Sequence, residues 1–138
     1  MTRHLAALAA LFALTFPAAA PAQSPIGFRS PSKNIACQYF SFDNQTALRC
    51  DIMEATVTAP RPRDCDLEWG KAFEMRPKGR AERLCYGDTI MDAGLPILAY
   101  SEVWQRGGFT CRSEQTGVTC FNADRRGFTI SRAKQEVF

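Results

Sequence analysis

Six cysteines are the residues of this chain best suited to chemistry, because a thiol can bind a metal, exchange electrons or close a disulfide. A zinc site made of four cysteines typically contains two close C-x-x-C pairs, and the sequence has none. An even number of cysteines in an exported chain is instead typical of a disulfide framework. The six form three pairs of neighbours along the chain: Cys37 and Cys50, Cys65 and Cys85, and Cys111 and Cys120.

Other catalytic groups are scarce. The only histidine, His4, lies in a predicted signal peptide, so triads and zinc sites that need imidazole are excluded from the mature chain. Asp64, Asp66 and Glu68 alternate along one segment and offer oxygen ligands for calcium, but no calcium-binding loop surrounds them and a solvated strand face is the simpler interpretation. A pair of carboxylates working as acid and base is a further alternative, and its geometry cannot be read from sequence. We therefore assign no catalytic residue, metal or cofactor.

Basic side chains crowd two proline-containing turns and are candidates for binding. The first turn contains Arg61 and Arg63. The second contains Arg76, Lys78 and Arg80, and Arg83 follows it closely. Converging turns would form a patch for lipid phosphates, an anionic glycan or an acidic protein, whereas ordinary surface solvation is the alternative.

The two tryptophans also have two interpretations. Trp69 and Trp104 would anchor a partner if exposed, or belong to the core if buried. The candidate partner-binding residues are Arg76, Lys78, Arg80 and Trp104.

The N-terminal 22 residues have the pattern of a secretory signal. Arg3 precedes an apolar run, Leu5–Phe16, which is too short for a stable membrane anchor. Small residues then predict cleavage before Gln23, and no cysteine nearby could carry a lipid. We expect a periplasmic or secreted protein consisting of one domain, residues 23–138.

Composition limits the partners. The chain of 138 residues has 17 basic and 14 acidic residues, and one basic residue, Arg3, lies in the signal. This balance is not that of a nucleic-acid-binding protein, whose basic residues cluster far more strongly.

Strand alternation suggests how the cysteines pair. Residues 34–42 and 45–52 predict a hairpin with Asp43 and Asn44 as a two-residue turn, which places Cys37 opposite Cys50. Shifting the register by one residue would place apolar residues opposite charged ones. Phe40 breaks the polarity of the other face. The same register pairs Ile35 with Ile52 and Tyr39 with Leu48.

A second hairpin is expected from residues 109–113 and 118–122, with a four-residue loop, Glu114–Gly117, and with Cys111 opposite Cys120. A further alternating run at residues 128–131 predicts a three-stranded meander over 109–132. Cys65 and Cys85 are paired by elimination only, so the sequence does not establish this bridge.

The remaining segments are read more coarsely. Residues 23–32 form an extended lead-in tethered by Phe28, residues 67–75 are strand or short helix, and strands are expected at 88–91 and 97–105. No helical period is sustained, so the predicted fold class is mainly β: a small disulfide-stabilised antiparallel β domain, either a barrel or a sandwich of hairpins.

Several motifs that join cysteines to their neighbours resemble a bacterial secreted family, domain of unknown function 6636. The resemblance implies an exported or envelope domain without established activity, and it transfers no catalytic residue. It also leads us to expect a histidine before Gly127, where this chain has Arg126. The motifs are FRSPSKNIAC (28–37), LRCDI (48–52), CYGDT (85–89), FTCRS (109–113), GVTC (117–120) and GFTISR (127–132).

The function expected from the sequence is that of a non-catalytic binding module of the bacterial envelope, with an envelope protein or anionic glycan as the partner. An inhibitor of a lysozyme or other exported hydrolase, and a small cell-wall enzyme with paired carboxylates, are the alternatives. The sequence does not indicate the oligomeric state.

Overall fold

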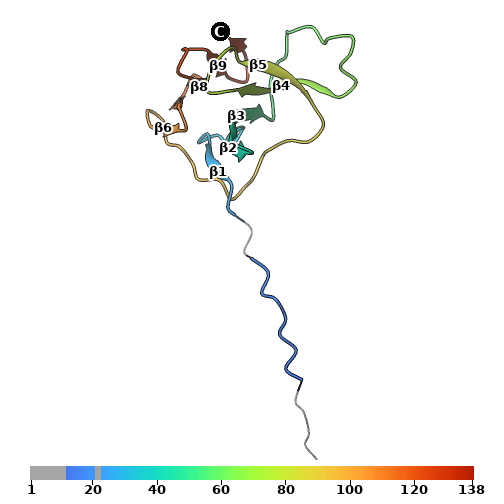
Figure 1. Ribbon diagram of the computed structural model, residues 1–138. Coiled ribbons are helices and arrows are strands. Elements are labelled where there is room, and N and C mark those ends of the chain that lie inside the picture. Colours follow the sequence, from blue (N-terminus) through green and yellow to red (C-terminus); the bar gives the residue numbers. More distant parts are fainter. Residues whose placement is uncertain (1–11, 21–22) are drawn as a thin grey trace, which may run out of the picture.

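A computed structural model of the chain describes residues 12–20 and 23–138 (Figure 1). Most of the predicted signal peptide, residues 1–11 and 21–22 with the cleavage site, lies outside this part, and the signal remains a prediction. Residues 12–20 contain no helix or strand. Within the described ranges, no helix is long and apolar enough to cross a membrane.

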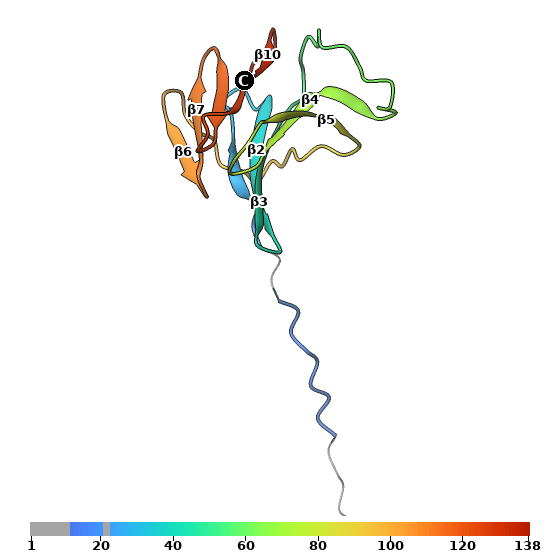
Figure 2. The same cartoon turned by 45° about the horizontal axis from the view of Figure 1, so that its top comes forward.

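The described residues form two antiparallel sheets of five strands each (Figures 1 and 2). The order in the first sheet is β1 (Ile26–Arg29), β2 (Ile35–Phe42), β3 (Gln45–Ile52), β4 (Glu68–Met75) and β5 (Glu82–Tyr86). The order in the second sheet is β10 (Gln135–Val137), β9 (Gly127–Ile130), β8 (Gly117–Phe121), β7 (Phe109–Glu114) and β6 (Val103–Arg106). The fold is therefore mainly β and is not a closed barrel.

The first predicted hairpin is confirmed. β2 and β3 pair with Cys37 opposite Cys50, and the flanking pairs also have the expected register. Asp43 and Asn44 form the turn with φ values of 48° and 60°, a conformation that asparagine and aspartate tolerate better than most residues. Alternation then directs Cys37 and Cys50 toward the core.

The second hairpin has the predicted cysteine pair but a tighter turn. Cys111 lies opposite Cys120, yet β7 continues to Glu114, which pairs with Gly117. The expected four-residue loop is wrong because the pairing extends one pair further than the alternating pattern indicated. Gly117 is required here because a Cβ would lie 2.3 Å from the carbonyl oxygen of Ile130 in the neighbouring β9.

Other segments differ from the expectations. Residues 88–91 form no strand, because their backbone groups bond to side chains of the first sheet. The predicted strand at 97–105 is regular only from Val103, where β6 (Val103–Arg106) begins. Residues 67–75 are strand rather than helix, with a bulge between Trp69 and Phe73. The meander over 109–132 is present, and β6 and β10 extend its sheet on either side. The lead-in contains β1, whose Phe28 is buried as expected.

Two disulfides meet at the centre of the sandwich. Cys37–Cys50 crosses β2 and β3, Cys111–Cys120 crosses β7 and β8, and the Sγ atoms of Cys50 and Cys120 are 3.8 Å apart. All four cysteines are fully buried. Each sheet therefore contributes one bridge to a shared core, which is completed by four fully buried phenylalanines: Phe28, Phe73, Phe109 and Phe128.

The third bridge, Cys65–Cys85, lies at the margin. It fastens the long segment between β3 and β4 to β5, and the pairing inferred by elimination is the one observed. Cys65 is buried, but Cys85 is exposed. Solvent can therefore reach this bridge at Cys85, whereas the two central bridges are fully buried.

Mild reduction of the folded protein should open Cys65–Cys85 first, because a reductant thiolate must reach a sulfur atom to attack it. Trapping with iodoacetamide and peptide mass spectrometry should show alkylation of Cys65 and Cys85 while the central bridges stay closed. Equally fast alkylation of Cys37 or Cys111 under conditions that preserve the circular dichroism spectrum would contradict this arrangement.

Candidate functional site

Asp51 is the one buried carboxylate within the described part of the chain, and therefore the first candidate for chemistry. Its side chain projects from the outer face of β3 because the neighbouring residues, Cys50 and Ile52, point inward. Arg49 binds it through two hydrogen bonds, from Nε at 2.8 Å and from Nη2 at 3.0 Å.

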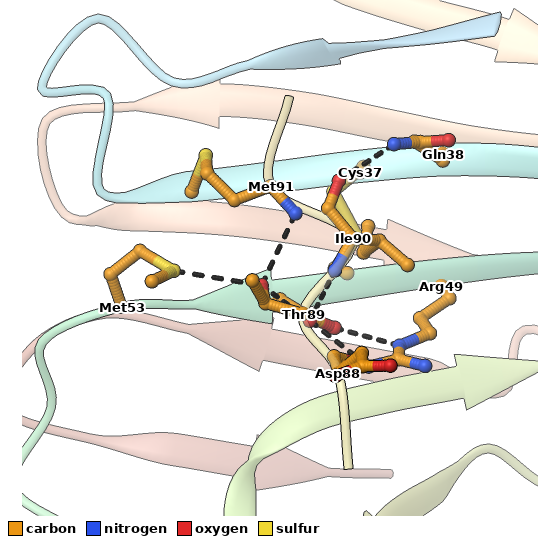
Figure 3. A network of polar contacts seen from close by, with 10 residues as sticks. Cys37, Gln38, Arg49, Met53, Asp88, Thr89, Ile90 and Met91 are labelled. Carbon is orange, nitrogen blue, oxygen red and sulfur yellow. Dashed lines mark hydrogen bonds and ion pairs between the residues drawn. A yellow bond between two sulfur atoms is a disulfide. The ribbon is translucent and has the colours of Figure 1, made fainter. Parts of the chain in front are cut away.

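The remaining partners of Asp51 come from residues 87–98, here called the strap, which lead from β5 toward β6. Oδ2 of Asp51 accepts hydrogen bonds from the Thr89 hydroxyl and the Ile90 amide, each at 3.0 Å. Arg49 and Gln38 donate to the carbonyl oxygens of Asp88 and Ile90 (Figure 3). Asp51 therefore fastens the strap over the first sheet, and its oxygens are occupied by these contacts.

A tyrosine borders this cluster. Burial raises the pKa of the Tyr86 phenol, the carboxylates of Asp51 and Glu68 act in the same direction, and Arg49 opposes them. The Arg49 guanidinium lies over the Tyr86 ring, 5.3 Å from its centroid. Because its pKa lies above an already high ordinary value, Tyr86 is neutral at physiological pH and does not supply a base.

Replacing Asp51 with Asn should lower the free energy of unfolding by about 2–4 kcal/mol, since Arg49 loses its buried counter-ion and an amide cannot accept all four hydrogen bonds. Urea denaturation of D51N measures this loss. D64N is the matched control, because Asp64 is exposed, and it should change stability by no more than about 0.5 kcal/mol. Equal stability of D51N and wild type would contradict the role of Asp51 as a clip.

Two turns that are distant in the sequence meet at one end of the sandwich. Residues 76–80 lie in the connection between β4 and β5, and residues 122–126 connect β8 to β9. Asn122, only 2% exposed, donates from Nδ2 to the carbonyl oxygens of Arg76 and Gly79, both at 2.9 Å. We call these joined turns the double turn.

Further hydrogen bonds fix its shape. The carboxylate of Asp124 accepts the Gly79 amide at 2.7 Å. Oδ1 of Asn122 accepts the amides of Asp124 and Arg126 at 3.0 and 3.1 Å. Asn122 thus organises its own turn with its oxygen and holds the other turn with its nitrogen.

The double turn presents five exposed cationic side chains. The guanidinium of Arg76 lies 3.6 Å from a carboxylate oxygen of Glu74. The other four have no carboxylate within 4.0 Å in the part of the chain that the structure describes. These four are Lys78, Arg80, Arg125 and Arg126.

The structure separates the residues that the sequence grouped. The turn with Arg61 and Arg63 precedes β4 and the turn at 76–80 follows it, so the two lie at opposite ends of an eight-residue strand and do not converge. Trp104 is half-buried on β6, two strands away from β8, with its ring centroid 5.7 Å from that of Phe28. Arg76, Lys78 and Arg80 remain together, and their partner-binding role stays a prediction.

Sequence reasoning missed the contribution of the second turn. Arg126 stands out in the sequence only as a departure from the family pattern, and nothing local indicates that Asn122 reaches a turn more than forty residues away. Among the described residues, the one group of three potential metal ligands is Cys37, Cys50 and Cys120, whose sulfurs are in disulfides. Asp64, Asp66 and Glu68 do not form such a group.

A polar cleft of about 470 Å³ lies between the ends of the two sheets. Arg132 and Glu54 form an ion pair in its wall. The side chain of Asn34 donates a hydrogen bond to the carbonyl oxygen of Glu54 and accepts one from the Glu54 amide. Cations and carboxylates are mixed around it, so the cleft does not select a ligand charge. Its charged lining residues are Lys33, Glu54, Glu114 and Arg132.

Fold and site together define a small disulfide-stabilised β-sandwich domain that carries exposed cations on two joined turns. A family model matches residues 6–138, and the chain belongs to this family, described as a family of unknown function, DUF6636. The comparisons with curated proteins and with solved structures found no match.

Proposed function

We propose that the protein is an exported, non-catalytic binding module whose double turn binds an anionic partner. The observation that carries the proposal is the pair of hydrogen bonds from Asn122 to the turn at 76–80. They bring together Lys78, Arg80, Arg125 and Arg126, whose charged groups have no carboxylate within 4.0 Å among residues 12–20 and 23–138. Cations that are not neutralised by neighbours attract anions and steer their approach.

The shape of the site supports an extended partner. The cations lie on turns that end strands, rather than around an enclosed cavity, so they are suited to a polymer or surface that offers several charges at once. Hydrogen bonds between the side chains of Asn122 and Asp124 and the backbone of the turn at 76–80 hold both turns in place, which lowers the entropy lost when the partner binds. Arg126, at the position where the family resemblance suggests histidine, adds a permanent charge to this surface.

Export is supported by the framework. Three disulfides with no free cysteine among the described residues are typical of an oxidising compartment. The N-terminal signal pattern points in the same direction. Because all six cysteines are paired, no thiol is left for nucleophilic or redox chemistry, and Asp51 is committed to the strap.

Heparin is a practical probe for an anion-binding surface. The variant K78Q/R80Q/R125Q/R126Q should elute from heparin resin at a lower NaCl concentration than wild type. Its affinity for a heparin oligosaccharide should fall by up to about tenfold, because four weak ion pairs are lost. Isothermal titration calorimetry at low ionic strength gives the dissociation constant.

The matched control is K33Q/R63Q/R112Q/K134Q, which removes four exposed cations outside the double turn and has the same net charge. It should elute close to wild type. If the two variants weaken binding equally, general charge and not the double turn is responsible. If neither wild type nor control binds heparin at low salt, the proposed function is wrong.

A further inference from the structure

Two aromatic side chains project from the outer face of β2, away from the core. Phe40 is 40% exposed and Phe42 is 79% exposed, because strand alternation places them on the face opposite to that of the fully buried Cys37. The water-facing side of an antiparallel sheet is normally polar, so two neighbouring exposed phenylalanines on it need a reason. We call Phe40 and Phe42 the aromatic pair.

The aromatic pair borders the double turn. A shallow hollow of about 270 Å³ is lined by the aromatic pair together with Ala47 and Arg76. Arg76 is the first residue of the turn at 76–80, so apolar and cationic side chains meet at this hollow. Glu74 also lines it and is paired with Arg76, and Arg76 joins the hollow to the turn that carries the exposed Lys78 and Arg80.

We propose that the aromatic pair and the double turn together dock the protein on an anionic lipid bilayer, an inference that rests on the proposed function. Cations near a membrane surface are attracted to lipid phosphates, and exposed aromatic side chains partition into the boundary between headgroups and acyl chains. A glycan polyanion offers the same charges but no apolar phase to receive two phenylalanines.

The hairpin tip limits how deeply the protein enters. Asp43 follows Phe42 directly, and its carboxylate is repelled by anionic headgroups and is costly to desolvate. Contact is therefore confined to the interfacial region, and attachment is peripheral and weakened by salt.

Vesicle sedimentation tests this docking. Wild-type protein should sediment with vesicles of phosphatidylcholine containing about 30% phosphatidylglycerol and not with pure phosphatidylcholine. F40S/F42S should bind the anionic vesicles about tenfold more weakly while binding heparin like wild type, because it loses apolar contact and no charge. The control L67S/V103S removes two exposed apolar side chains elsewhere and should bind both probes normally.

A tryptophan introduced at position 42 gives a second test, in which a fluorescence change is measured on protein that still binds the vesicles. The emission of F42W, measured against wild type, should shift to the blue when anionic vesicles are added, as the indole leaves water. Heparin should cause no such shift.

The outcomes separate the two proposals. Heparin binding by wild type without vesicle binding overturns the membrane inference and leaves the anionic-partner proposal standing. Vesicle binding by F40S/F42S equal to wild type overturns the role of the aromatic pair. Failure to bind either probe overturns both.

Discussion

The contact between two disulfides at the centre of the sandwich is the constraint on which the rest of this structure depends. The Sγ atoms of Cys50 and Cys120 are 3.8 Å apart, and each belongs to a bridge within its own sheet. A small domain buries too little apolar surface to be very stable, and cross-links offset this by reducing the freedom of the unfolded chain. Here the same sulfur atoms also fill the space between the sheets.

Because the packing of the two central disulfides holds the sheets together, the turns at the ends of the sheets can be polar. Once the sheets are joined at the core, the turns at their ends need not contribute apolar contacts. The turns at 76–80 and 122–126 are instead held to each other by Asn122 and Asp124, and their cations face solvent. The strap is held by Asp51 in the same way, through a buried polar group with a full set of partners. Polar clips therefore arrange the surface, and sulfur and aromatic groups hold the core.

The features that could be predicted from the sequence are those set by local patterns. Cys37 and Cys50 are separated by a short turn, and strand alternation with apolar neighbours leaves one sensible register. The same reasoning applies to Cys111 and Cys120, where only the turn length was wrong. β5 was not predicted because its residues do not alternate, since exposed Cys85 lies among partly buried neighbours.

The candidate site was only half predictable. Lys78 and Arg80 are conspicuous in the sequence, but their companions Arg125 and Arg126 join them through Asn122, and a side-chain bond of this range leaves no periodic signal. Trp104 is a suitable anchor by residue type, but in the structure it packs against Phe28 and is partly buried. Phe40 was visible as a break in alternation, and its meaning depends on the neighbouring turn, which only the fold brings close.

The central claim is that two distant turns act as one anion-binding surface. Amide chemical-shift mapping by NMR, with a short heparin oligosaccharide added to the oxidised protein at low salt, tests it most directly. The account predicts that shifts occur together and with one dissociation constant at residues 76–80 and 122–126. Shifts confined to one turn, or centred instead on Lys33 and Arg132 in the cleft at the other end of the sandwich, would contradict it.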